Sequence, residues 1–312
     1  MKPVSSRPFT GSKNLFPLLL MLLAVPASGQ LYVASWHTGN YDGTVGLYTP
    51  SGTAINASLV TGIAQPTGLT TDGHGHLFLS GGDHYVKEYT TSGANVQVPL
   101  ISSGEWLQGI ASDGNYLYLP QWTSGTVGKY TTSGVLVSAS LISGLSSPTG
   151  IAFDGNGHLF VANESTGTIG EYTTAGATVN ASLISGLINP DGLALDGNGH
   201  LFVANYGNFP QPGSIGEYTT SGSTIDATLI SGLARPSGIA LDGAGHLFES
   251  NAGDNTVKEY TTGGVLINNS LIAGLSNPSA LLFIPEPSSA ALLALGMALF
   301  RCNRIRIRAA QK

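Results

Sequence analysis

The sequence lacks residues on which many protein classes depend. Its single cysteine is Cys302, near the C-terminal end, so the rest of the chain offers neither disulfides nor thiol chemistry. Charged residues make up only 10% of the chain. The body must therefore be held together by side-chain packing and by backbone pairing.

Basic residues are scarce in the middle of the chain. Between Gln30 and Ile284 there are four Lys or Arg against 17 Asp or Glu, which gives a net charge of −13. A protein that binds nucleic acid needs a basic stripe for the phosphate backbone. We therefore expect no nucleic-acid partner.

Glycine is abundant, with 43 residues, and short runs of Val, Ile and Tyr alternate with Ser, Thr and Gly. This composition favours short strands joined by tight turns. The chain also repeats, with Asp-Gly pairs spaced 41, 41, 42 and 46 residues apart. Such periods are typical of propeller blades, which have four strands each. The pairs begin at Asp72, Asp113, Asp154, Asp196 and Asp242.

The fourth copy predicts four strands, at residues 150–154, 158–163, 168–173 and 181–185. Asn156-Gly157 is a strong hairpin signal between the first two. Pro190 then starts the next copy, since proline cannot continue a strand ladder. The Asp-Gly turns lack the further ligands and the closing Glu of an EF-hand, so we predict hairpin turns and not calcium loops.

The two ends of the repeat region complement each other. The first copy opens at Leu31 and lacks a first strand, whereas the last copy, Pro278 to Ile284, has only a first strand. Joined, they make one complete blade and leave no open sheet edge. The sequence therefore predicts an all-β fold, a six-bladed β-propeller closed by pairing of the C-terminal strand with the N-terminal blade.

The repeat core PTGIAFDGNGHLFVAN, at residues 148–163, resembles the NHL-type six-bladed propellers. The resemblance extends over residues 31–284. It implies the propeller fold and says little about activity, because propellers host many functions.

Two copies have a longer loop after the second strand. The aromatic residue of that strand precedes the Tyr of the third by 11 or 12 residues in four copies, but by 16 in the first and fifth. Blades one and five both flank blade six in a six-membered ring. We therefore expect the long loops to rise on either side of blade six, on one face.

Side chains just after the second strands should meet on one face of the ring, where loops commonly carry function. Aromatic rings beside amides and carboxylates suit a sugar or another small polar ligand, although ordinary loop polarity is the alternative. The candidate ligand-binding residues are Trp36, His37, Asp83, His84, Trp122, Asn163, Asp191, Asn205, Tyr206, Glu249, Asn251 and Asp254.

Four histidines recur at one repeat position, so each belongs to a different blade and they cannot share one zinc ion. We interpret them as residues at the start of the second strands. They are His76, His158, His200 and His246.

A metal site is an alternative. Glu249, Asn251 and Asp254 offer oxygen ligands of the kind that Ca²⁺ or Mg²⁺ prefers. The chain resembles gluconolactonase-type propellers in blade number and in its Asn positions, and those proteins hold a divalent cation at the axis. This resemblance implies a lactonase-like hydrolase, and a divalent-metal lyase on the same face is a further alternative. The sequence contains no nucleophile motif, so our leading interpretation has no catalytic residue and no cofactor.

Both ends of the chain predict targeting segments. Residues 1–29 combine basic residues with the apolar run Leu15 to Val25, as a secretory signal does. Residues 285–312 contain Pro285, Glu286 and Pro287, then a short apolar run and an Arg cluster. This order resembles the PEP-CTERM sorting signal, which implies processing by an exosortase and export in a Gram-negative bacterium that makes exopolysaccharide.

We therefore expect a propeller at residues 30–284 between two targeting segments, through which alone the chain would meet the membrane. The leading functional hypothesis is an exported, non-catalytic protein of the cell surface or extracellular matrix that binds a glycan or a protein partner. The alternatives are the metal-dependent hydrolase or lyase, and a purely structural spacer.

Overall fold

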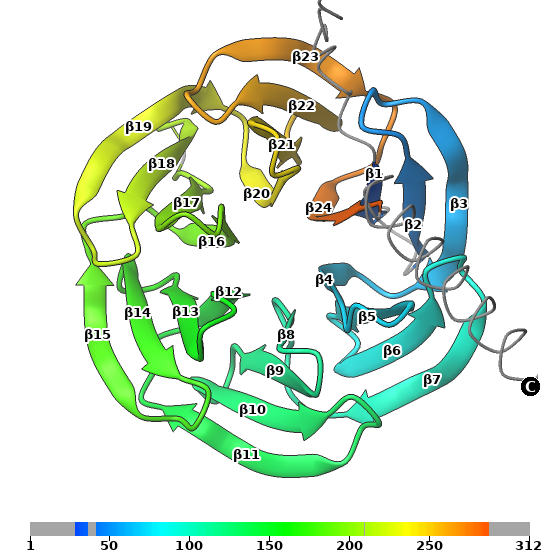
Figure 1. Cartoon of the computed structure of the whole chain (residues 1–312), viewed down its shortest axis with the longest axis vertical. Coiled ribbons are helices and arrows are strands. Elements are labelled where there is room, and N and C mark those ends of the chain that lie inside the picture. The colour runs from blue at the N-terminus through cyan, green and yellow to red at the C-terminus, as the bar shows by residue number, and fades with distance from the viewer. Residues whose placement is uncertain (1–28, 37–41, 209, 287–312) are drawn as a thin grey trace, which may run out of the picture.

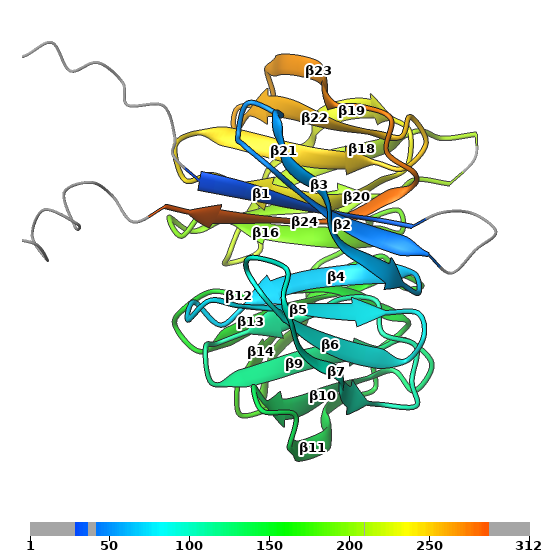
Figure 2. The same ribbon diagram turned by 90° about the vertical axis from the view of Figure 1, so that its right-hand side faces the viewer.

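The computed structural model describes residues 29–36, 42–208 and 210–286. Within them, six four-stranded antiparallel sheets stand like blades around a central axis (Figure 1). Seen from the side, the ring forms a disc about one strand thick (Figure 2). The predicted fold class is confirmed.

In the first three blades the strands follow one another from the axis to the rim. Blade 1 consists of β24 (Pro278–Pro285), β1 (Gly29–Ser35), β2 (Gly43–Tyr48) and β3 (Ala54–Ile63). Blade 2 consists of β4 (Pro66–Thr71), β5 (His76–Gly81), β6 (Tyr85–Thr90) and β7 (Asn95–Ser102). Blade 3 consists of β8 (Ala111–Ser112), β9 (Tyr116–Gln121), β10 (Thr126–Thr131) and β11 (Leu136–Ser143).

The other three blades have the same order. Blade 4 consists of β12 (Pro148–Phe153), β13 (His158–Asn163), β14 (Thr168–Thr173) and β15 (Thr178–Ile184). Blade 5 consists of β16 (Pro190–Leu195), β17 (His200–Asn205), β18 (Gly213–Thr219) and β19 (Thr224–Leu233). Blade 6 consists of β20 (Pro236–Leu241), β21 (His246–Asn251), β22 (Thr256–Thr261) and β23 (Leu266–Ile272).

In blade 4 the two middle strands have the predicted bounds, and the outer two begin earlier than expected. β12 begins at Pro148 because that residue already pairs with Asn163 across a bulge. β15 begins at Thr178 because the preceding turn closes at Ala177, whose carbonyl accepts the Thr173 N–H at 2.8 Å.

The ring closes in blade 1 as predicted. β24, from the end of the described chain, pairs antiparallel with β1 from its start, and Val33 lies opposite Leu281. All four strands of blade 1 therefore have partners like those of the other blades, and no open edge is left between the first and last copies.

The hydrophobic core lies between neighbouring blades, in six clusters. Each blade contributes one fully buried aromatic ring from its second strand and one buried Tyr from its third. Large aromatic side chains of this kind dominate the energetics of packing. The second-strand rings are Tyr32, Phe78, Tyr118, Phe160, Phe202 and Phe248. The third-strand residues are Tyr48, Tyr89, Tyr130, Tyr172, Tyr218 and Tyr260.

Glycines on the innermost strands let the blades approach each other at the axis. A β-carbon at Gly192 would overlap the carbonyl oxygen of Ser237 in the next blade, and one at Gly150 would overlap that of Asp191. Glycine is the residue that permits such close approach of two backbones. As a result, the side chains that precede these glycines converge on the axis.

The two faces of the disc differ. We call the face on which the innermost strands begin the entry face, and the face with the Asp-Gly turns the turn face. On the turn face, Asp154 accepts the backbone N–H groups of Asn156 and His158 at 2.7 and 2.9 Å, and its other oxygen lies 3.2 Å from His158 Nδ1. The hairpin turns are confirmed, and the aspartate shapes them.

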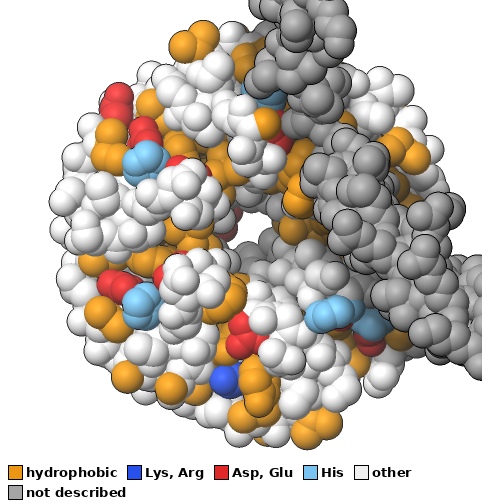
Figure 3. Space-filling model, viewed as in Figure 1, with side chains coloured by type: hydrophobic (Ala, Val, Ile, Leu, Met, Phe, Trp, Pro, Cys, Tyr) orange, Lys and Arg blue, Asp and Glu red, His pale blue; other side chains and the backbone are white. Residues whose placement is uncertain are grey.

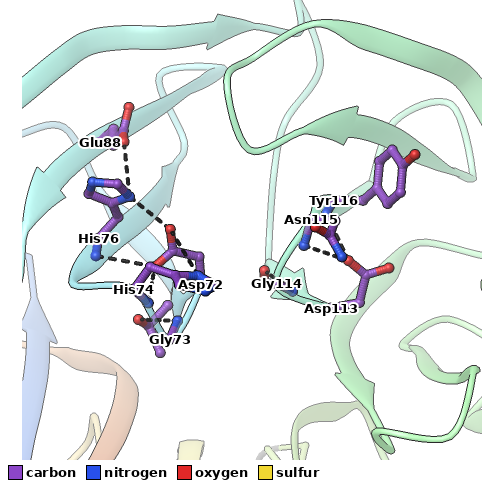
Figure 4. Close-up of polar contacts among 11 residues, drawn as sticks. Asp72, Gly73, His74, His76, Glu88, Asp113, Gly114, Asn115 and Tyr116 are labelled. Atoms are coloured by element: carbon purple, nitrogen blue, oxygen red, sulfur yellow. Dashed lines mark hydrogen bonds and ion pairs between the residues drawn. The ribbon is translucent and has the colours of Figure 1, made fainter. Parts of the chain in front are cut away.

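The same Asp–His pair recurs in blades 2, 5 and 6, and Figure 3 shows histidines beside acidic side chains around this face. In blade 2, His76 Nδ1 lies 2.7 Å from Asp72 and 3.7 Å from Glu88 (Figure 4). Burial would raise the pKa of Asp72, but hydrogen bonds from His74 and His76 lower it below its usual value.

Blade 3 has no histidine at this position, and Asp113 is bonded differently there. Its carboxylate accepts the backbone N–H groups of Asn115 and Tyr116 (Figure 4). It also accepts the Tyr118 hydroxyl at 2.8 Å. Each histidine thus belongs to its own blade, at the start of the second strand as predicted.

The described chain begins and ends on the turn face, where Gly29 pairs with Pro285. The predicted signal, residues 1–28, and the tail from Pro287 onward lie outside the described residues. None of the described residues forms a helix that is long and apolar enough to cross a membrane.

Candidate functional site

A cavity of about 510 Å³ opens on the entry face, at the axis of the ring. All six blades contribute to its wall. A narrower space of about 80 Å³ continues beneath it along the axis. The lining residues are Trp36, Gln65, Thr67, Trp106, Gln108, Thr149, Glu164, Asn189, Pro190, Asp191, Tyr206, Arg235, Ser237, Ala252, Asn277, Pro278 and Ser279.

The floor of the cavity consists of one side chain from each blade, and we call this set the axial ring. Its hydroxyls donate hydrogen bonds to carbonyls of the next blade, as from Thr149 to Pro190 at 2.9 Å and from Ser279 to Pro66 at 2.6 Å. These bonds hold neighbouring blades together around the axis. The axial ring is Thr67, Gln108, Thr149, Asp191, Ser237 and Ser279.

The residue before each entry proline has an unusual backbone conformation. In five blades its φ angle is positive, a conformation that side-chain-bearing residues rarely adopt. Strained positions of this kind cluster at binding sites, where the fold holds them in place. The five residues are Gln65 (φ 43°), Ser147 (50°), Asn189 (49°), Arg235 (60°) and Asn277 (40°), and all except Ser147 line the cavity.

Aromatic side chains reach the cavity from alternate blades. Trp36 belongs to blade 1, Trp106 to blade 3 and Tyr206 to blade 5. Two charged side chains also line the wall. Glu164 accepts a hydrogen bond from Trp122 Nε1 at 3.0 Å, and Arg235 enters from the blade 6 side. The site therefore offers flat apolar faces together with charges of both signs.

Asp191 is the one acidic member of the axial ring. Burial raises the pKa of its carboxyl to about 7, a hydrogen bond with Ser237 opposes this rise, and the negative charge of Glu164 adds to it. The carboxyl therefore changes between its protonated and ionised forms near neutral pH.

The structure brings three of the predicted site residues together in the cavity, namely Trp36, Asp191 and Tyr206. His37 lies outside the described residues. Trp122 does not line the cavity but contacts it through Glu164. The other predicted residues are not among those that line it. They are Asp83, His84, Asn163, Asn205, Glu249, Asn251 and Asp254.

Several of these side chains serve the loops of their own blades. Asp83 forms an ion pair with Lys87, and the His84 ring packs edge-on against Trp106 at 6.5 Å between centroids. Asn163 is buried and accepts the Ser146 N–H at 3.3 Å. Asn205 is also buried, and its amide lies 3.4 Å from Ser214 Oγ.

Glu249 lies in the interior of blade 6, fully buried, and neither of its carboxylate oxygens has a hydrogen-bond partner. Burial raises the pKa of this carboxyl to about 8, although the charge of Lys258 opposes the rise. Asn251 is also fully buried, and its Oδ1 accepts the Asp254 N–H at 3.2 Å. Lys258 itself is bonded to Asp254 at 2.7 Å.

The proposed oxygen ligands of a metal are thus divided between a buried glutamate and an aspartate already paired with lysine. The described residues contain no group of three or more His, Cys, Asp or Glu side chains placed to hold a metal ion. The metal alternative stays a prediction.

Sequence reasoning missed Trp106, Arg235 and most of the axial ring as binding residues. The repeat carried a signal for the ring, because each member except Gln108 directly follows the entry proline. The repeat carried no signal for the cavity as a whole, because the shape of the cavity depends on how closely the blades meet at the axis.

The longer loop of blade 5 reaches the cavity through Tyr206. Asn189 fixes this loop, because its side-chain amide donates to the Gly207 carbonyl at 2.9 Å. Arg235 and Ala252 of blade 6 line the same cavity. Most of the longer loop of blade 1, residues 37–41, lies outside the described residues.

Comparison with known proteins now places the chain in a family. The model of the virginiamycin B lyase family matches residues 27–295. The chain belongs to the virginiamycin B lyase family. The resemblance to NHL-type propellers is thus correct for the six-bladed fold, while the family that matches is that of the lyase. A search of curated proteins returned no match.

Solved structures of low identity share the fold of this virginiamycin B lyase family member. A chain of the nidogen/laminin complex has a TM-score of 0.68 at 14% identity, over 82% of this chain and 98% of its own. A putative 6-phosphogluconolactonase from Bacteroides fragilis has a TM-score of 0.59 at 11% identity, over 84% of this chain and 99% of its own. Virginiamycin B lyase from Staphylococcus aureus has a TM-score of 0.52 at 20% identity, over 71% of this chain and 78% of its own.

Proposed function

We propose that the entry-face cavity binds a small polar ligand of the size of a mono- or disaccharide, such as the end of a glycan. Its volume of about 510 Å³ lies within the range of ligand sites, which is roughly 300–1,000 Å³. The observation that carries the proposal is the combination of two features. Aromatic faces from alternate blades stand above an axial ring of hydroxyl, amide and carboxyl groups.

This arrangement matches the two kinds of surface on a sugar. The C–H faces of a pyranose pack on aromatic rings, and its hydroxyls exchange hydrogen bonds with polar side chains. The strained residues before the entry prolines, among them Asn189 and Asn277, hold their side chains at the cavity wall before any ligand arrives. Such preorganisation lowers the entropic cost of binding.

We also propose that the protein is exported and attached or processed through its C-terminal tail. The tail motif begins at Pro285, on the turn face, whereas β24 begins at Pro278, which lines the cavity. A surface anchored by the tail would therefore present the cavity outward. Comparing the secreted protein with a variant that lacks residues 285–312, by fractionation of the producing cells, tests this part.

A pair of tryptophan variants tests the binding site. Trp106 and Trp122 are each 39% exposed, but only Trp106 lines the cavity. We expect Trp106→Ala to weaken binding of a soluble oligosaccharide by about tenfold or more in calorimetry, since a buried aromatic contact is worth on the order of 1–3 kcal/mol. Trp122→Ala should change the affinity by less than about threefold. Equal effects of both substitutions would contradict the proposed site.

A lyase or hydrolase is the second candidate, and it is favoured by the family and by Asp191. A carboxyl whose pKa lies near 7 is suited to exchange a proton with a ligand at neutral pH. One related structure is described as a catalytically inactive histidine-to-alanine variant of the S. aureus lyase with quinupristin. The carboxyl groups among the described residues that line this cavity are Asp191 and Glu164, and Asp191 lies at the axis.

Liquid chromatography with tandem mass spectrometry of quinupristin or a simple lactone, incubated with the protein, tests this candidate, because ring opening by elimination leaves the mass unchanged whereas hydrolysis adds one water. Ring opening that is lost in Asp191→Asn would support it, and a chelator would show whether Ca²⁺ or Mg²⁺ takes part. Recovery of both compounds unchanged would contradict the lyase or hydrolase candidate and leave ligand binding as the proposed function.

A further inference from the structure

The axial ring consists of four hydroxyl side chains, the amide of Gln108 and one carboxyl, that of Asp191. The hydroxyls of Thr67, Thr149, Ser237 and Ser279 each donate to a carbonyl of the next blade, at 2.6–2.9 Å. Those four side chains are thus already engaged in joining blades. Asp191 places a carboxyl at the equivalent point in blade 5, where a threonine or serine would complete the pattern.

When it is ionised, Asp191 carries a charge that the protein itself does not balance. Among the described residues no Lys, Arg or His forms an ion pair with it. The charged group that acts on it is another carboxylate, Glu164, which makes ionisation harder. A carboxyl partly withdrawn from water is costly to ionise without a nearby cation, unless a ligand supplies the positive charge.

The walls around Asp191 also suit a cation. Trp36, Trp106 and Tyr206 line the same cavity, and aromatic faces attract ammonium groups through their quadrupoles. Arg235 occupies the blade 6 side, so the negative part of the cavity lies toward blades 4 and 5, where Glu164 and Asp191 are found.

We propose that the ligand of the cavity carries an ammonium group, as an amino sugar does, and that this group pairs with Asp191 at the axis. The inference rests on the proposed function, because it names the class of ligand for the same cavity. The hydroxyls of the sugar would meet the amide side chains of the wall, and its ring would pack on the aromatic side chains.

Pairing with an ammonium group links binding to proton release. In the free protein at pH 6.5, burial keeps the Asp191 carboxyl mostly protonated, because its pKa is about 7. An ammonium group nearby favours the ionised form and lowers that pKa. Binding therefore releases protons, which calorimetry detects as a dependence of the heat on the ionisation enthalpy of the buffer.

The experiment compares the fully deacetylated disaccharide of glucosamine with its di-N-acetyl form, using the full chain. The two probes share ring size and linkage, and only the first carries ammonium groups. We expect the amine form to bind about tenfold to a hundredfold more tightly, as charge-assisted hydrogen bonds do, and to release protons.

Two variants locate the effect. Asp191→Asn keeps the shape of the side chain and removes its charge, so it should bind both disaccharides equally and release no proton. Asp254→Asn is the control, because Asp254 is bonded to Lys258 and does not line the cavity. That variant should retain the preference for the amine form. Thermal unfolding of both variants verifies that each is folded.

The possible failures separate the two claims. If both disaccharides bind with similar affinity to the wild type, or if Asp191→Asn keeps the preference, the ammonium inference is wrong and the cavity remains a glycan site. If neither disaccharide binds, both the inference and the proposed glycan function are contradicted.

Discussion

The two faces of the propeller use the repeat in opposite ways. On the turn face, four blades carry the same Asp–His pair in the same geometry, as in Asp154 with His158. On the entry face, five blades share one strained backbone position before a proline, yet its side chain is Gln, Ser, Asn, Arg or Asn. The turn face thus repeats its side chains, and the entry face repeats only its backbone.

This difference separates structure from function within one scaffold. The aspartate that closes the first hairpin is needed wherever a turn joins the first two strands, and all five blades with such a turn have it. A ligand is not six-fold symmetric, so a site on the axis needs different groups at equivalent positions, such as the carboxyl of Asp191 where four other blades have a hydroxyl. The following predictions test this division, starting with the change that should affect both faces.

Gly192→Ala should have the largest effect, because the new β-carbon would overlap the Ser237 carbonyl at the axis. We expect a loss of about 3 kcal/mol in the free energy of unfolding, measured with urea, and weaker ligand binding. Gly263→Ala is the matched control. Its nearest neighbour would be Thr261 Oγ1 at 3.8 Å, so its stability should be unchanged. Equal stability of the two variants would contradict the account of the axis.

Glu249→Val should stabilise the protein by about 1–4 kcal/mol at pH 8, because it removes a buried carboxylate that has no hydrogen-bond partner. Valine is the residue that blades 4 and 5 have at this position, as Val161 and Val203. Lys258 keeps Asp254 as its partner. Ligand binding should be unaffected, because Glu249 does not line the cavity.

The stabilisation by Glu249→Val should also depend on pH. The folded-state pKa of Glu249 is about 8, above its value of 4.5 in the unfolded chain. Its contribution to stability is therefore fully present below about pH 4.5 and is lost as the pH rises toward 8. Urea unfolding should show a larger advantage of Glu249→Val at pH 8 than at pH 5. An advantage independent of pH would mean that the carboxyl titrates normally.

Asp154→Ala should cost about 1–2 kcal/mol of stability, because two backbone N–H groups of the hairpin lose their acceptor. Its effect on ligand binding should be small, since the turn lies on the opposite face. Asp196→Ala should cost a similar amount, and the double variant should show roughly the sum. Weaker ligand binding in folded Asp154→Ala would break the division between the faces.

The fold could be predicted because the information is repeated. The Asp-Gly spacing, the proline that opens the first strand in five of the six blades and the complementary half-blades at Leu31 and Pro278 together fixed the number of blades and the closure. Each of these signals depends on local backbone chemistry. Strand ends were less certain, because the bulge after Pro148 depends on pairing across the blade.

The candidate site could be predicted only in part. Residues after the second strands were an obvious choice, yet Asn163 and Asn205 are buried and support loops of their own blades. Trp106 was missed because its blade lacks the entry proline, so the repeat gave no alignment at that point. Contact across the axis between residues some 40 positions apart leaves no trace in local sequence.

The central claim is that the entry-face cavity is a ligand site. The fluorescence of the chain's own tryptophans can test it. Its three tryptophans are Trp36 and Trp106, which line the cavity, and Trp122, which is bonded to Glu164 in its wall. Titration with soluble glucosamine oligosaccharides, followed by intrinsic tryptophan emission, should give a saturable change that Trp106→Ala reduces. Emission that stays constant up to millimolar ligand, while calorimetry detects binding, would place the ligand elsewhere and contradict the account.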